Sequence, residues 1–412
     1  MIIETSNRYG MKKNGCSLKN FMLAIAIFNI TNCLFHIYKH KLSAHDFIWV
    51  WKECACALKG IDVFDAISKQ MYIDGIGYMP VASATVPWAR IIGNIIHPGF
   101  FSMNWAIVYG YVVYALIVIL AWWTVSKKLS EYYVIGKRYA YFLSGLFFLM
   151  PFYWVDGLMV LNNGFVISFL LIIVAMTCDT HEYLAGFVLA LAMMKPQMAL
   201  LFYITLFFKK KYKTIVVSGS LLVASWLIYI LMVGGNPLLQ VKEILGQSEE
   251  KSAEFIWFGI MDWMTKLGVS GTVTMCCSML VGILFTIVIT FLIMKSKYKN
   301  NLFVLFSIPA FFSTIWCYKS ETDLMILILP SIIIMLLCAD RNAKWIQLFG
   351  VMYLSIFNVK IFTGGIRRLV GYDWIMGRNI DAWVRLIFFV AVIYVMVTGN
   401  CNAYKESDGQ GA

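Results

Sequence analysis

The chain has 412 residues, of which 61% are apolar, 16% aromatic and only 14% charged. Soluble domains carry about 25% charged residues, so this composition excludes a soluble globular domain, a disordered chain and a disulfide scaffold. The formal net charge of +12 comes from short basic clusters between apolar runs. It therefore indicates membrane topology rather than binding of nucleic acid.

Apolar runs divide the chain into candidate membrane helices. A hydrocarbon core of about 30 Å needs about 20 helical residues, and several runs approach this length. We predict an all-α polytopic membrane protein with 10 to 12 transmembrane helices, built as a single integral membrane domain over residues 1–412. The predicted segments are 21–35, 105–123, 139–155, 164–177, 183–194, 198–208, 214–233, 273–294, 302–316, 324–338, 345–362 and 383–397.

Two of these segments, 183–194 and 198–208, are short for a membrane crossing. Joined by Lys195-Pro196-Gln197, they form either two tilted helices or a re-entrant pair, and each arrangement returns the chain to the same side. With the N-terminus in the cytoplasm, the cytoplasmic side holds more than half of the 34 Lys and Arg but fewer than half of the 22 acids. The positive-inside rule then predicts a multi-pass protein of the cell membrane with both termini cytoplasmic.

The predicted loops differ between the two faces. Those on the cytoplasmic side are short, whereas three extracytoplasmic segments are long: 39–104, 234–272 and 363–382. Loops that a rigid helical frame positions commonly carry binding and catalytic residues. We therefore expect function on the outer face.

The first outer loop, 39–104, contains a carboxylate just after the first helix. Ser43 and Asp46 match an S-x-x-D capping box, which predicts Asp46 in the first turn of a helix. The alternative role is a general base at the bilayer interface, flanked by His45 and Trp49. The two roles are compatible, because a cap holds a carboxylate in fixed geometry.

Further along this loop, Gly60-Ile61-Asp62-Val63-Phe64-Asp65 predicts a turn, and Tyr78-Met79-Pro80 follows. Interfacial tyrosine and tryptophan side chains anchor a protein in the membrane or, as the alternative, stack on sugars. The ten cysteines are scattered without ligand spacing. We interpret them as small apolar residues, with a disulfide at Cys54 as the minor alternative.

Charged residues beside apolar runs mark further candidates. A lysine at membrane depth, such as Lys195, marks a functional site by default. It contacts phosphate, extends its ammonium to the interface, or pairs with an acid such as Asp156. In Tyr318-Lys319-Ser320-Glu321-Thr322-Asp323, dense charge lies between two apolar runs. Asp323 caps a helix there, or the charged residues contact substrate and phosphate.

Two arginines in the last outer loop, Arg367 and Arg368, depart from the positive-inside pattern. Arginine suits phosphate because its guanidinium makes two parallel hydrogen bonds. Either they bind an anionic substrate or they contact lipid headgroups.

The order of these motifs resembles glycosyltransferase family 87, a family of membrane enzymes with the GT-C architecture. The resemblance covers roughly residues 43–330. Where that family often has Gly-Gln before the fourth helix, this chain has Asn162-Asn163, and the segment 234–272 has no clear counterpart. The matching motifs are Asp46-Phe47, the G-x-D-x-F-D turn, Tyr-x-Pro at 78–80, Ala185-Gly186-Phe187, Lys195-Pro196-Gln197, Lys209-Lys210-Lys211 and the segment 318–323 that leads to Pro330.

The resemblance implies an inverting transferase that moves a monosaccharide, a mannose-type hexose or similar, from a polyprenyl-phosphate sugar to a lipid-linked or cell-envelope glycan acceptor on the outer face. Asp46 matches the catalytic acid of the family, and Lys195 and the segment 318–323 match positions that line its cavity. We assign donor-phosphate binding to Lys195, Lys319, Arg367 and Arg368. We assign substrate binding to His45, Trp49, Tyr78, Gln197, Tyr318, Glu321 and Asp323.

We expect no metal, no cofactor and no nucleic-acid partner, since the outer loops contain no D-x-D and the chain has no P-loop. The expected partners are the donor, the acceptor and membrane lipids. One alternative is a transporter or flippase for a lipid-linked saccharide, although no internal repeat is visible. Another is a polymerase or ligase of surface polysaccharide, which would use a diphosphate-linked oligosaccharide as donor.

Overall fold

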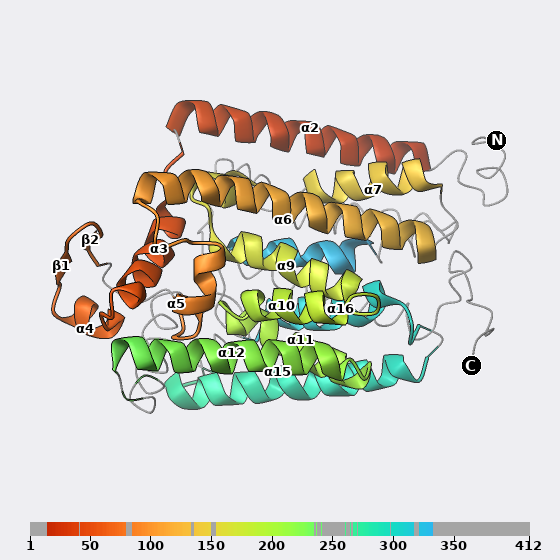
Figure 1. Cartoon of the computed structure of the whole chain (residues 1–412). Coiled ribbons are helices and arrows are strands. Elements are labelled where there is room, and N and C mark those ends of the chain that lie inside the picture. Colours follow the sequence, from red (N-terminus) through yellow and green to blue (C-terminus); the bar gives the residue numbers. More distant parts are fainter. Residues whose placement is uncertain are drawn as a thin grey trace.

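The computed structural model describes residues 15–40, 42–79, 85–132, 136–149, 154–234, 267–269, 271–296, 298–316 and 321–332, with the single positions 236, 240, 260 and 264. This part of the chain is a bundle of helices with one small two-stranded sheet (Figure 1). The bundle contains α2 (Gly15–His40), α6 (Met103–Tyr132), α7 (Lys137–Leu149), α8 (Trp154–Met159), α9 (Asn163–Thr177), α10 (Glu182–Ala192), α11 (Pro196–Phe208), α12 (Tyr212–Val233), α15 (Gly271–Met294), α16 (Leu302–Phe312) and the 3₁₀ helix η2 (Glu321–Leu327).

The predicted apolar segments from 21–35 to 324–338 each overlap a described helix, and 345–362 and 383–397 lie outside the described residues. Within the predicted segment 139–155, the structure describes α7 up to Leu149 and α8 from Trp154, and residues 150–153 lie outside the described residues. In the described part of the chain, the three helices α6, α12 and α15 are long and apolar enough to cross a membrane.

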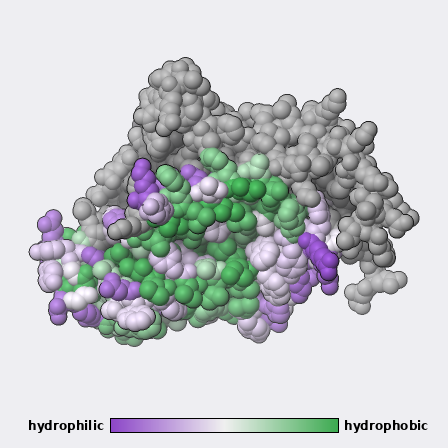
Figure 2. Space-filling view, turned by 90° about the horizontal axis from the view of Figure 1, so that it is seen from above, coloured by the Kyte–Doolittle hydropathy of each residue, from purple (hydrophilic) through white to green (hydrophobic). Residues whose placement is uncertain are grey.

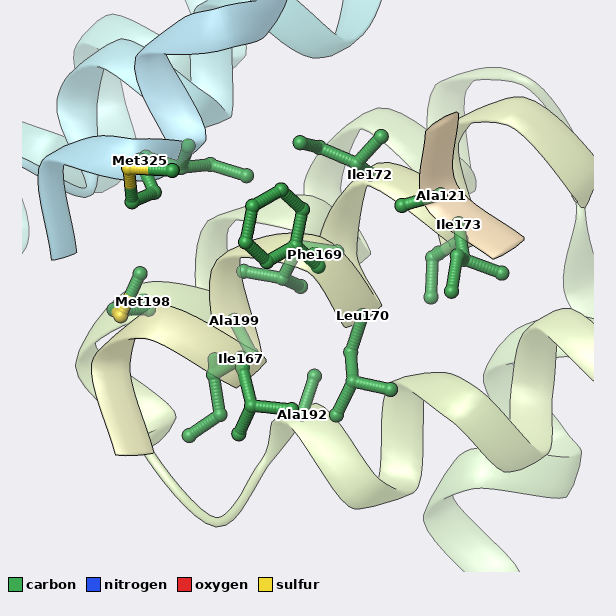
Figure 3. Packing of buried hydrophobic residues seen from close by; sticks show 14 of the residues in the cluster. Ala121, Ile167, Phe169, Leu170, Ile172, Ile173, Ala192, Met198, Ala199 and Met325 are labelled. Atoms are coloured by element: carbon green, nitrogen blue, oxygen red, sulfur yellow. The ribbon is translucent and has the colours of Figure 1, made fainter. Parts of the chain in front are cut away.

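Helix α9 forms the centre of the bundle. Its N-cap is Asn162, and nearly all of its side chains are buried. Helices α6 and α10 and the 3₁₀ helix η2 pack around it. Figure 3 shows the short side chains of Ala121, Ala192 and Ala199 facing α9 from α6, α10 and α11. Small residues let helices approach one another closely, which is the usual packing inside membrane bundles.

The long helices have their apolar side chains on the outside. On α12, Val216, Leu227 and Leu231 are exposed, whereas the small polar residues Ser218 and Ser225 are buried. Lipid solvates apolar side chains, so this distribution is the one expected of a helix that faces a bilayer. Figure 2 shows hydrophobic residues along the middle of the described surface and hydrophilic residues at its two ends.

Helices α10 and α11 form a hairpin with Lys195 at its apex. Their 11 and 13 residues give lengths of about 17 and 20 Å, less than the core of a bilayer. Lys211, just after α11, pairs with Glu182, at the start of α10, at 3.5 Å. The end of α11 therefore lies beside the start of α10, as the predicted hairpin requires. Pro196 begins α11, and the residue before a proline is disfavoured in helices, so the chain turns at Lys195.

The described residues of the segment 39–104, predicted to be the first outer loop, form a cap at one end of the bundle (Figure 1). The Gly60–Asp65 segment was expected to be a turn throughout, which is wrong. Gly60 turns the chain with a φ of +70°, but Asp62 then caps a helix, accepting from the N–H of Phe64 at 2.8 Å. The cap consists of α3 (His45–Leu58), α4 (Val63–Ser68), the antiparallel strands β1 (Tyr72–Ile73) and β2 (Gly77–Tyr78), α5 (Ala89–Ile92) and the 3₁₀ helix η1 (Gly93–Ile95).

Candidate functional site

The first turn of α3 carries Asp46 and is held by backbone contacts from another segment. The predicted capping box is wrong, because the N-cap is Ala44, with a φ of 47°, and no side chain caps the helix. The N–H groups of Ala44 and Asp46 donate instead to the carbonyls of Met159 and Val160, at 3.0 and 3.1 Å. The unsatisfied donors of a helix start need partners, and the chain just before α9 supplies them.

The next residue, Phe47, fixes this turn against the bundle. Its ring is fully buried and lies 4.6 Å from the ring of His97. It occupies a notch at Gly110 of α6, where a Cβ atom would overlap the ring. Tyr114 of α6 donates to the carbonyl of Leu161 at 3.1 Å, which joins α6 to the same segment. Burial lowers the pKa of His97 to about 3, so its ring is neutral at physiological pH.

Asn162 connects Asp46 to a segment far along the chain. Its side-chain nitrogen donates to Oδ2 of Asp46. Its Oδ1 accepts from the N–H of Gly164 at 2.8 Å and from the hydroxyl of Thr322 at 2.5 Å. The site thus assembles α3, the start of α9 and η2 around one amide.

Lys195 meets the residue after Thr322. Its Nζ lies 2.6 and 2.7 Å from the two carboxylate oxygens of Asp323. Asp323 is almost fully buried, with 1% of its side chain exposed, whereas Lys195 retains 16%. Of the three alternatives for Lys195, pairing with an acid is observed, and the acid is Asp323. The assignment of Lys195 to donor-phosphate binding stays a prediction.

Two tryptophans clamp the turn that carries Lys195. The indole N–H of Trp88 donates to the carbonyl of Met193 at 3.0 Å. That of Trp316 donates to the carbonyl of Gln197 at 2.6 Å. Both carbonyls lie within two residues of Lys195, so the backbone of the turn that carries Lys195 is bound on both sides.

The electrostatic environment of Asp46 has both signs of charge. Burial is the main influence and raises the pKa of its carboxyl. The hydrogen bond from Asn162 and the positive charges of His45 and Lys195 lower this pKa, and the negative charge of Asp323 raises it. Asp46 is therefore partly buried within electrostatic range of the Lys195–Asp323 pair.

Three of the other predicted site residues lie beside Asp46 or Lys195, and a fourth, Tyr78, lies elsewhere in the cap. His45 and Trp49 lie beside Asp46 on α3, with their rings 4.9 Å apart. Gln197 belongs to the Lys195 turn. Tyr78 is on β2, and its carbonyl accepts from Lys52, in the middle of α3. The β1–β2 hairpin therefore contacts the middle of α3 and not its first turn, which carries Asp46.

Tyr318, Lys319, Arg367 and Arg368 lie outside the described residues, and only the backbone of Glu321, at the start of η2, is described. Cys54 is a buried free thiol, as expected of a small apolar residue. In the described part of the chain, no three His, Cys, Asp or Glu side chains gather where they could hold one metal ion.

Asn162 and Thr322 were not predicted as site residues. Asn162 precedes an apolar run, which is a helix N-cap signal, but that signal does not indicate its contact with Asp46. A buried ion pair between Glu53 of α3 and Arg90 of α5, at 3.3 Å with neither side chain exposed, was not predicted either. Their positions inside apolar stretches were the available signal.

Comparison with protein-family models, with curated proteins and with solved structures found no match to this chain.

Proposed function

We propose that this chain is an inverting membrane glycosyltransferase of the GT-C type, which transfers a monosaccharide from a polyprenyl-phosphate sugar to a lipid-linked or glycan acceptor on the outer face of the membrane. The observation that carries the proposal is a continuous line of contacts from a carboxylate to a cation. Asp46 binds Asn162, which binds Thr322, and the adjacent Asp323 binds Lys195. Three of the motifs on which the family resemblance rests, those that contain Asp46, Lys195 and Asp323, contribute to this line of contacts.

Asp46 has the chemistry of a general base. The acceptor hydroxyl loses its proton as its oxygen attacks the anomeric carbon, and a carboxylate within hydrogen-bond reach takes that proton. Among the described residues, the hydrogen bonds of the Asp46 carboxylate are made at Oδ2. Oδ1 is the oxygen that we assign to the acceptor hydroxyl.

Asp323 is less suited to that role. Both of its oxygens accept from Lys195, and its side chain is almost fully buried. A carboxylate held in this way orients a cation rather than meeting an incoming hydroxyl. We therefore assign Asp323 to the support of Lys195.

Lys195 supplies positive charge for the leaving group. As the bond between the anomeric carbon and the phosphate oxygen breaks, its electron pair stays on the polyprenyl phosphate, which leaves as an anion. A cation fixed near that oxygen stabilises the developing charge. A single displacement on the opposite side of the carbon inverts the anomeric centre.

The test is a transfer assay on purified protein in lipid, with a panel of radiolabelled polyprenyl-phosphate monosaccharides and membrane-lipid extract as acceptor. Wild type is expected to move label into a new product. Asp46→Asn keeps the shape of the side chain and removes the base, so it is expected to lose at least about 100-fold in rate. Asp65→Asn, an exposed carboxylate on α4, is the matched control.

Either of two results would overturn the proposal. The first is full activity of Asp46→Asn. The second is absence of transfer from every donor by folded wild type, which would favour the alternative of a transporter, polymerase or ligase for a lipid-linked saccharide.

A further inference from the structure

Asn162 makes three hydrogen bonds that fix the orientation of its amide. The oxygen accepts from the N–H of Gly164 and from the hydroxyl of Thr322. The backbone N–H of Gly164 can only donate, so this end of the amide is the oxygen. The nitrogen, which can only donate, therefore faces Asp46.

The backbone around Asn162 holds this amide in place. Leu161, just before it, has a φ of +50°, a left-handed conformation that costs a residue with a branched side chain on the order of 1 kcal/mol. The side chain of Leu161 is fully buried, and its carbonyl accepts from Tyr114. Asn162 itself donates its backbone N–H to Gly157 at 3.2 Å. The backbone is thus hydrogen-bonded at the carbonyl of Leu161 and at the N–H of Asn162, which fixes the position of the Asn162 side chain.

The same segment fixes the backbone of Asp46. The carbonyl of Val160 accepts from the N–H of Asp46, two residues before the amide that binds its carboxylate. Asp46 is consequently held twice by one short stretch of chain, once at its backbone and once at its side chain. This double contact leaves the carboxylate little freedom to turn relative to α9.

We propose that Asn162 is the positioning residue for Asp46. The side-chain amide N–H of Asn162 orients the carboxylate of Asp46 and favours its ionised form. The inference rests on the proposed role of Asp46 as the base. This proposal also gives a role to Asn162, the first residue of the Asn162-Asn163 pair at which the chain departs from the family that it resembles. A hydrogen bond to the charged form of an acid stabilises that form, and here it opposes the effect of burial.

Other charges also face Asp46 and set the background for this effect. His45 is on the same helix, Lys195 lies on the α10–α11 turn, and Asp323 is on η2. Tyr114 faces Asp46 from α6. Asn162→Ser introduces no charge beside these four groups, so a change in the protonation of Asp46 in that variant measures the loss of the amide N–H.

The experiment measures protonation of Asp46 by a method independent of catalysis. Dicyclohexylcarbodiimide modifies protonated carboxyl groups in apolar surroundings, and mass spectrometry of the modified peptide gives the fraction of Asp46 labelled at each pH. Asn162→Asp keeps the N-cap oxygen and replaces the donor with a second carboxylate. We expect the midpoint of labelling, and the midpoint of the pH–rate profile of transfer, to rise by about one pH unit or more.

Two further variants complete the test. Asn162→Ser keeps a helix-capping oxygen but is too short to donate to Asp46, so it should also raise the midpoint if Asn162→Asp does not fold. Asn301→Asp makes the same change at the N-cap of α16, which binds the N–H groups of Phe303 and Val304, and should leave the midpoint unchanged.

The labelling result decides the inference whether or not transfer is detected. A labelling midpoint that is the same in wild type and in the folded Asn162 variants would overturn it. A shifted midpoint in a protein that transfers no sugar would support the role of Asn162 and reject the proposed function instead.

Discussion

Both carboxylate oxygens of Asp323 accept hydrogen bonds from the ammonium of Lys195, at 2.6 and 2.7 Å, across 128 positions of sequence. This ion pair joins the apex of the α10–α11 hairpin to η2, and η2 packs on the central helix α9. The pair is therefore a structural link as well as a part of the candidate site.

The two roles of the pair can be separated by a double-mutant cycle. Removing one partner leaves a buried charge without its counter-ion, so Lys195→Ala and Asp323→Ala should each lower the free energy of unfolding by about 3–5 kcal/mol. The double variant should recover part of this loss but transfer no sugar, since it lacks the cation at the leaving group. Thermal unfolding and the transfer assay measure the two effects, with Lys405→Ala as the control. Restored transfer in the double variant would show that Lys195 acts only in folding.

The pH dependence of Asp46 follows from the direction of its shift. Burial raises the pKa of this carboxyl in the folded protein, so the native state holds its proton at a pH where the unfolded chain has lost it. Stability then falls as the pH rises from the ordinary pKa of aspartate to the raised one. Transfer should rise over the same interval, because the base must be ionised.

Asp46→Asn should remove the fall in stability. At low pH its melting temperature should match that of wild type, and at neutral pH it should be higher. Melting curves of both proteins between about pH 4 and pH 8 measure the difference. Parallel curves throughout that interval would contradict a raised pKa for Asp46.

The sequence predicted much of the site because the relevant signals are local. An acid after the first helix marked Asp46, and a lysine within an apolar run marked Lys195. The contact between Asp46 and Asn162 was not predictable in this way, because it spans 116 positions and depends on how α3 docks against α9.

The incorrect capping box has the same cause. A sequence pattern identifies caps made by side chains near the helix start, whereas the N–H groups of α3 find backbone carbonyls at Met159 and Val160. Backbone carbonyls are present at every residue and leave no pattern in the sequence. The pairing of Glu53 with Arg90 was not predictable because it spans 37 positions and depends on how α5 docks against α3.

Gly164 provides a sensitive test of the packing between α9 and η2. A Cβ atom at this position would overlap the carboxylate of Asp323. Gly164→Ala should displace Asp323 from Lys195, lower the melting temperature and reduce transfer on the order of 100-fold.

The matched control is Gly219→Ala in α12, where a Cβ atom would have no neighbour within 4 Å. In a helix interior this change should stabilise the protein by up to about 1 kcal/mol. Equal melting temperatures and rates for the two variants would contradict the close contact at Gly164.

The ion pair of Glu53 and Arg90 should support the cap without taking part in transfer. Arg90 lies 4.5 Å from the ring centre of Phe64 and donates to the hydroxyl of Tyr229 at 2.6 Å, so it ties α3 and α4 to α12. Arg90→Met leaves Glu53 buried without its counter-ion and should cost about 3–5 kcal/mol of stability. Glu53→Gln combined with Arg90→Met should recover much of that loss. Glu53 lies two helical turns from Asp46, so the double variant should retain transfer at a temperature where it is folded. A stable Arg90→Met protein without transfer would instead assign Arg90 to substrate binding.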